Sequence, residues 1–117
     1  MHNYRELKFW SHSKSLAVNI YSKTKDFPDS EKFGLTSQLR RAAISVPSNI
    51  AEGSGRQSNK EFVRFLNIAT GSLYELETQL EIANEIGLLN DKNFKILNNE
   101  VLSVIQMMTK FKMRISC

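Results

Sequence analysis

The chain has 117 residues, a formal net charge of +4 and one cysteine, Cys117, at its last position. This length suits a single domain over residues 1–117, and one cysteine excludes an internal disulfide. No apolar run approaches the ~20 residues of a membrane-spanning helix, so we expect a cytoplasmic protein whose mild positive charge favours anionic partners.

The first helix is expected at about residues 7–25, where apolar residues recur at helical spacing before Phe27-Pro28 closes the segment. Phe9 and Leu16 lie off its expected inner stripe. That stripe consists of Leu7, Trp10, Ala17, Ile20 or Tyr21, and Thr24.

The second helix is expected to begin at Asp29 or Ser30 and to end at Glu52. Gly53-Ser54-Gly55 follows, and glycine-rich runs of this kind end helices. The apolar stripe of this helix consists of Leu35, Leu39, Ala42, Val46 and Ile50.

The third helix has the clearest amphipathic pattern in the chain, because its apolar residues step by alternating fours and threes over six turns. Ser58 is expected to cap its start, with Glu61 three residues further on, and Gly87 stands where the helix should stop. The stripe consists of Phe62, Leu66, Ala69, Leu73, Leu76, Leu80 and Ala83.

The fourth helix repeats the pattern, and Asn90 or Asp91 is expected to cap its start. Its stripe consists of Phe94, Leu97, Val101, Val104, Met108, Phe111 and Ile115. Because the links between successive helices are short, neighbouring helices should be antiparallel. The sequence therefore predicts an all-α fold, an antiparallel up-down-up-down four-helix bundle.

Several helices carry more apolar residues than one core stripe needs. Besides Phe9 and Leu16, the surplus consists of Phe65, Ile68, Ile82, Ile86, Ile96, Leu102 and Ile105. A second apolar stripe on several helices favours self-association, since another copy of the chain would cover it.

The sequence contains no recognisable pattern of catalytic or metal-binding residues. Neither His2 nor His12 has a glutamate three residues before it, as the metal sites of di-iron bundles require, and no Cys/His cluster has metal-ligand spacing. Gly53-Ser54-Gly55-Arg56 lacks the lysine and the preceding strand of a phosphate-binding loop. We therefore expect no enzyme activity, no catalytic residues, no metal and no cofactor.

A polar stripe runs along the second helix beside its apolar face, formed by Arg41, Ser45, Asn49 and Glu52. The third helix has a matching set, Ser72, Glu75 and Gln79. Three interpretations stay open: an ordinary solvated face, a paired polar seam inside the bundle or between subunits, and a ligand contact. In the seam, Arg41 could reach Glu75, and such pairs set register and partner choice.

Basic residues gather around the second and third helices: Arg40, Arg41, Arg56, Lys60 and Arg64. The spacing of the last three puts them on one side near the connecting turn. They could bind phosphates and displace counterions, although a solvated helix end explains them equally well. The patch has no interleaved aromatic residues, so we expect no base stacking there.

Two blocks carry a family resemblance: GLTSQLRRAAISVPSNIAEGSGR at residues 34–56 and FLNIATGSLYELETQLEIANEIGLL at residues 65–89. They resemble the small four-helix bundle proteins encoded in intervening sequences of bacterial 23S rRNA genes, nearly from end to end. The residues that match the family's motifs are Gln38, Arg40, Arg41, Ser45, Asn49, Glu52, Gly53, Arg56, Gly71, Ser72 and Glu75.

The resemblance implies a homopentamer. A related branch of the family, the accessory variability determinants of diversity-generating retroelements, binds nucleic acid and a reverse transcriptase. With Gln38 added from the resemblance, the expected polar seam or subunit interface consists of Gln38, Arg41, Ser45, Asn49, Glu52, Ser72, Glu75 and Gln79.

Three functions follow, and the first is favoured. It is a non-enzymatic oligomeric scaffold that binds nucleic acid, RNA rather than DNA, through its basic surface residues. The second is a protein-interaction module that recruits a nucleic-acid enzyme such as a reverse transcriptase. The third is a purely structural oligomer.

Overall fold

The computed structural model describes residues 1–116, so Cys117 lies outside the described residues. Four long helices account for most of the chain: α1 (Lys8–Lys23), α2 (Leu35–Ser54), α3 (Asn59–Glu85) and α4 (Asp91–Ser116). Short 3-10 turns precede α1 at Tyr4–Glu6 and α2 at Asp29–Glu31. Residues 1–116 contain no β-strand, and none of their helices is both long and apolar enough to cross a membrane.

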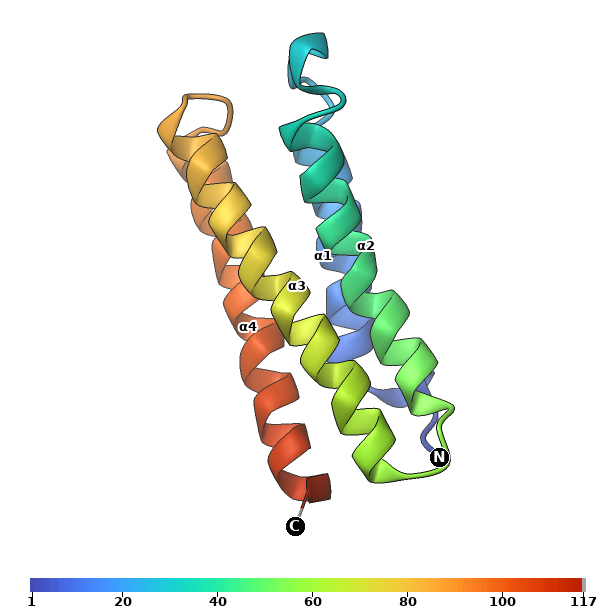
Figure 1. Cartoon of the computed structure of the whole chain (residues 1–117). Helices are drawn as coiled ribbons and strands as arrows, with labels where there is room; N and C mark the ends of the chain where they lie inside the picture. The colour runs from blue at the N-terminus through green and yellow to red at the C-terminus, as the bar shows by residue number, and fades with distance from the viewer. Residues whose placement is uncertain (117) are drawn as a thin grey trace.

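The four helices lie side by side in an elongated body of 44 × 23 × 19 Å (Figure 1). Each helix contacts the next one along the chain, and α1 also contacts α4, which closes the ring. Along the α2–α3 contact, Gln38 meets Gln79 whereas Ser45 meets Ser72. Residue numbers therefore rise along α2 as they fall along α3.

The apolar stripe predicted for the third helix is confirmed in full, because each of its seven side chains is buried. Burial of a large apolar side chain contributes roughly 1.5–3 kcal/mol, so this stripe is a main source of stability. The α4 stripe is buried from Leu97 to Phe111, with Phe94 and Ile115 packed at its two ends. On α2 the stripe is buried from Leu39 to Ile50, and Leu35 packs at its edge.

The stripe predicted for the first helix is incomplete at its start. Phe9 and Leu16 are core residues, exposed by 4% and 1%, whereas Leu7 and Trp10 are half-buried at the core's edge. The Trp10 ring instead contacts Tyr4, with ring centroids 4.9 Å apart, and so packs under the N-terminal turn. Further along α1, Ile20 takes the core position that Tyr21 could also have filled.

The second helix begins later than expected. The residues predicted to start it form the separate 3-10 turn. The backbone of Gly34 is not helical, so α2 begins at Leu35. The Glu31 carboxylate accepts a hydrogen bond from the Leu35 amide at 3.3 Å, so it satisfies one of the unpaired amides at the helix start. At its other end α2 continues past Glu52 to Ser54.

The predicted caps of the third and fourth helices agree with the structure. The Ser58 hydroxyl accepts from the Glu61 amide at 3.1 Å, and the Asn90 side chain accepts from the Asn93 amide at 2.7 Å. Asn90, rather than Asp91, therefore caps α4. Gly87 has a φ of +83°, the left-handed conformation that glycine adopts without strain.

The N-terminal segment is held against the helices by hydrogen bonds and ring contacts of His2. The His2 amide donates to the Ser54 carbonyl at 2.9 Å, and its ring nitrogen is hydrogen-bonded to Asn59 at 2.9 Å. The same ring packs against Phe62 and Phe111. His2 thus joins the end of α2 to the start of α3 and the end of α4.

The surplus apolar residues divide into two groups. Phe65 is buried and Ile105 packs against the core, like Phe9 and Leu16. Five others keep between 40% and 58% of their surface exposed: Ile68, Ile82, Ile86, Ile96 and Leu102.

Candidate nucleic-acid interface

The two polar stripes meet along the α2–α3 contact. The hydroxyls of Ser45 and Ser72 are hydrogen-bonded at 2.9 Å. The side-chain nitrogen of Asn49 donates to the Ser45 backbone carbonyl at 2.8 Å and to its hydroxyl at 3.0 Å. Two turns away, the side-chain nitrogen of Gln79 donates to the side-chain oxygen of Gln38 at 3.5 Å. The structure therefore brings these five predicted residues together in a polar seam inside one chain.

Between these two sets of contacts the seam opens into a surface hollow of about 460 Å³, which we call the seam hollow. Arg41 and Glu75 both line it, yet both are exposed. Among residues 1–116 the structure records one ion pair, between Arg64 and Glu61. Arg41 and Glu75 therefore do not form an ion pair with each other. The full lining is Phe33, Ser37, Gln38, Arg41, Glu75 and Gln79.

Glu52, the last residue of the predicted seam, is exposed near the end of α2. The two glutamines, the serine pair and Asn49 thus form the seam's hydrogen bonds, while Arg41, Glu52 and Glu75 present charges to solvent along its outer edge.

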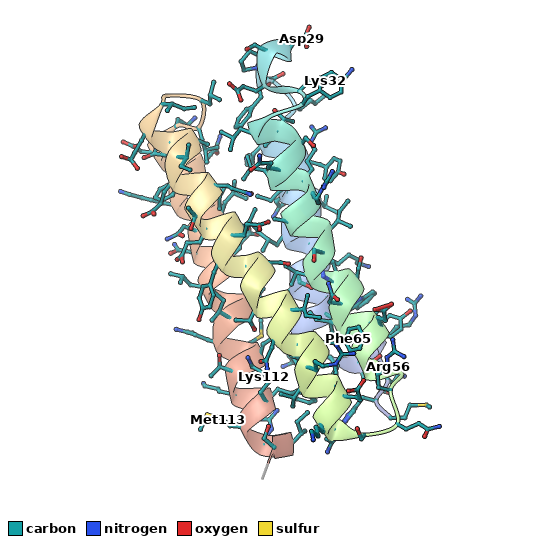
Figure 2. The ribbon with its side chains drawn as sticks, viewed as in Figure 1. Asp29, Lys32, Arg56, Phe65, Lys112 and Met113 are labelled. Atoms are coloured by element: carbon teal, nitrogen blue, oxygen red, sulfur yellow. The ribbon has the colours of Figure 1, made fainter. Side chains whose placement is uncertain are left out.

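A second feature lies at the α2–α3 turn, around Phe65. The Arg56 guanidinium lies 4.7 Å from the centroid of the Phe65 ring and the Arg64 guanidinium 5.1 Å from it. Figure 2 shows Arg56 and Phe65 next to each other at this end of the molecule. Phe65 is 6% exposed, so the two arginines help to cover it. A guanidinium over a ring can still donate N–H groups to an anion, but two nitrogens of Arg64 already donate to the Glu61 carboxylate, at 3.3 and 3.4 Å.

Lys60 is exposed one turn before Arg64 and borders a hollow that Val63 and Ile115 also line. The Arg64–Glu61 ion pair, 3.3 Å long, is largely exposed and contributes little to stability. We call Arg56, Lys60, Arg64 and the underlying Phe65 the turn cluster. The spacing predicts three cations on one side of the turn; the structure places two of them, Arg56 and Arg64, over a ring that the sequence did not reveal.

Arg40 is held elsewhere. Its Nε donates to the Thr24 hydroxyl at 3.0 Å, its terminal nitrogen donates to the Tyr21 carbonyl at 3.4 Å, and its guanidinium lies 4.5 Å from the Tyr21 ring centroid. Arg40 therefore caps the C-terminal end of α1. At 1.5 Å per residue it lies about 21 Å along α2 from Ser54, the last residue of the helix before Arg56, so the five predicted cations form two groups and not one patch.

Two polar contacts between helices were not predicted. Lys112 on α4 donates to the side chains of Asn67 at 3.1 Å and Thr70 at 3.3 Å, and partial burial lowers the pKa of its ammonium. Asn19 on α1 donates to Glu100 on α4 at 2.6 Å. A single sequence carries no signal for such pairs, because they depend on how helices far apart in the chain are aligned.

Taken together, the fold and these surfaces define a helical protein whose chemistry lies in hydrogen-bonding and charged side chains. Within the part of the chain that the structure describes, no three His, Cys, Asp or Glu side chains gather where they could hold a metal ion.

The sequence pattern of the 23S rRNA-intervening sequence protein family matches residues 5–110, so the chain belongs to that family. No curated protein matches the chain. The crystal structure of a protein of unknown function from the S23 ribosomal protein family of Bacteroides thetaiotaomicron is similar, with a TM-score of 0.80 and 23% sequence identity. The match covers 89% of this chain and 97% of that one, and it supports the fold alone.

Proposed function

We propose that this protein is a non-enzymatic oligomeric scaffold that binds nucleic acid in the cytoplasm, RNA in preference to DNA. The observation that carries the proposal is the turn cluster, in which two guanidinium groups lie over one buried ring and Lys60 is exposed one turn before Arg64. Cations held in place lose little freedom when they bind phosphate, and each one releases condensed counterions from the nucleic acid. The family's connection with 23S rRNA favours RNA as the anion.

For assembly, we propose an antiparallel up-down-up-down bundle, one domain over residues 1–117, that forms a homopentamer. The exposed isoleucines of α3 and the exposed Ile96 and Leu102 of α4 support self-association, because a partner chain would remove their apolar surface from water. Sedimentation equilibrium tests this part directly. A mass of one chain at micromolar concentration would contradict it.

The RNA proposal is tested by replacing Arg56, Lys60 and Arg64 with Gln, which removes the three charges but keeps part of each arginine stem over Phe65. Filter retention of a single-stranded RNA should show weaker binding, with a salt slope smaller by about 2, since each phosphate contact in a single strand contributes about 0.7. The matched control replaces Lys25, Lys92 and Lys95, three exposed lysines outside the turn cluster, with Gln.

The control must retain most of the affinity. If both triple variants weaken binding equally, general charge and not the turn cluster is responsible. If the wild-type protein retains no RNA at low salt, the scaffold does not bind RNA, and recruitment of another protein or a purely structural role becomes the better account of the fold.

A further inference from the structure

One polar atom in the wall of the seam hollow has no hydrogen-bond partner among residues 1–116. Gln79 is 7% exposed, and its carbonyl oxygen has no donor within residues 1–116. A buried amide oxygen without a partner is unfavourable by about 1–3 kcal/mol, but this oxygen is screened from solvent, so an occupant of the hollow meets the exposed groups at its edge first. The side-chain nitrogen of Gln79 donates to Gln38, so the side-chain oxygen is the atom without a partner.

Charges of both signs border the same hollow. Arg41 offers several N–H donors, whereas the Glu75 carboxylate is an acceptor with two oxygens. A free phosphate would meet the carboxylate and be repelled. The hollow instead suits a neutral group with two adjacent donors on one edge and an acceptor beside them.

An aromatic ring stands at the rim. Phe33 lines the hollow with 91% of its surface exposed, and the ammonium of Lys32 lies 5.6 Å from the centroid of its ring. Figure 2 shows Lys32 at the connection between α1 and α2, at the end of the molecule away from Arg56. An exposed ring offers a face on which a base can stack, and the nearby cation suits that nucleotide's phosphate.

We infer that the seam hollow binds an unstacked guanine of single-stranded RNA. Guanine presents two neighbouring donors, N1–H and the N2 amino group, which match the Glu75 carboxylate, and its O6 acceptor lies beside them for Arg41. Adenine and cytosine place a ring nitrogen acceptor next to their amino group, and uracil has one donor between two acceptors. The other three bases therefore each leave one oxygen of the Glu75 carboxylate without a donor.

The inference rests on the proposed function and adds base selectivity to it. The hollow and the turn cluster lie on the same α2–α3 side. Arg41 and Gly53 are separated by about 18 Å along α2, at 1.5 Å per residue. One strand of RNA could then contact phosphate-binding cations at one end and place a base at the other.

The test uses ten-nucleotide RNAs of uridine with one central G, A, C or U, and a fifth with inosine, which lacks the N2 amino group. Fluorescence anisotropy on the full chain should give about tenfold tighter binding for G than for the other bases, with inosine between them. Glu75→Gln should abolish the preference, whereas Glu81→Gln, an exposed carboxylate further along α3, should keep it. Phe33→Ala should weaken all five RNAs by a similar factor.

Equal affinity for all five RNAs would overturn the inference and leave the proposed function standing. No binding to any of them would overturn both. If Glu75→Gln changes the sedimentation coefficient while the base preference is unaltered, the hollow is a contact between copies of the chain and the inference is wrong.

Discussion

Gly53 and Phe65 lie so close together that a Cβ atom on Gly53 would stand 2.5 Å from the Cβ of Phe65. The same atom would lie 3.0 Å from the ring of Phe62. The glycine therefore lets the end of α2 approach the start of α3 closely enough for Phe65 to be buried beneath Arg56 and Arg64.

Replacement of Gly53 by Ala should lower the free energy of unfolding by about 1–3 kcal/mol, because backbone-near atoms must move to admit the methyl group. Urea denaturation followed by circular dichroism measures this. Gly71→Ala is the matched control: nothing lies within 4 Å of its Cβ position in the middle of α3, so it should stabilise the helix by about 0.5–1 kcal/mol. An equal effect at both positions would contradict the close approach.

Gly87 should be sensitive for a different reason. Its φ of +83° disfavours a side chain although nothing lies within 4 Å of the Cβ position. Gly87→Ala is expected to destabilise by about 1 kcal/mol through backbone strain alone. Gly55→Ala, at a φ of −84°, should change the melting temperature much less. Comparable losses at Gly55 and Gly87 would rule out conformational strain as the cause.

The hydroxyl pair in the polar seam should contribute measurable coupling. Ser45→Ala and Ser72→Ala each remove one partner of the 2.9 Å hydrogen bond, and the double variant removes both. A double-mutant cycle in urea should give a coupling free energy of about 0.5–1.5 kcal/mol. A coupling of zero would mean that the two hydroxyls are satisfied equally well by water.

Arg40 should act on stability and not on RNA binding. Arg40→Gln removes the contacts to Thr24 and to the Tyr21 carbonyl, which end α1, and should cost about 1 kcal/mol. RNA affinity in the filter assay should stay within about twofold of the wild type at 25 °C, since the Arg40 guanidinium is already engaged. A large loss of affinity in a fully folded variant would return Arg40 to the RNA-binding set.

Lys112 should make stability depend on pH in the alkaline range. Partial burial lowers its folded-state pKa below the ordinary value of 10.5, so the unfolded chain binds the proton more tightly than the folded chain does. The unfavourable contribution of the charged lysine is fully present below the lowered pKa and disappears as pH rises towards 10.5. Stability relative to Lys112→Met should therefore increase over that window.

Urea denaturation at several alkaline pH values measures this difference. The matched control is Lys110→Met, because Lys110 is exposed on the same helix. A wild-type protein that loses stability relative to Lys112→Met as pH rises would show that the hydrogen bonds to Asn67 and Thr70 outweigh desolvation.

Most of the helical architecture was predictable from local patterns. The stripe of α3, the capping of α3 by Ser58 and the left-handed Gly87 are all encoded within a few residues of one another. The start of α1 was not, because Leu7 and Trp10 fit a helical spacing as well as Phe9 and Leu16 do. Only the neighbouring N-terminal turn, which covers Trp10, distinguishes the two faces.

The same division holds for the candidate surfaces. Local spacing identified the polar residues of α2 and α3 and the cations at their turn, since positions three and four apart share a helix face. It could not show that Arg40 turns back to α1, that Phe65 lies beneath two arginines, or that Arg41 and Glu75 border one hollow unpaired. Those relationships depend on the register between helices, which core packing sets and no short segment encodes.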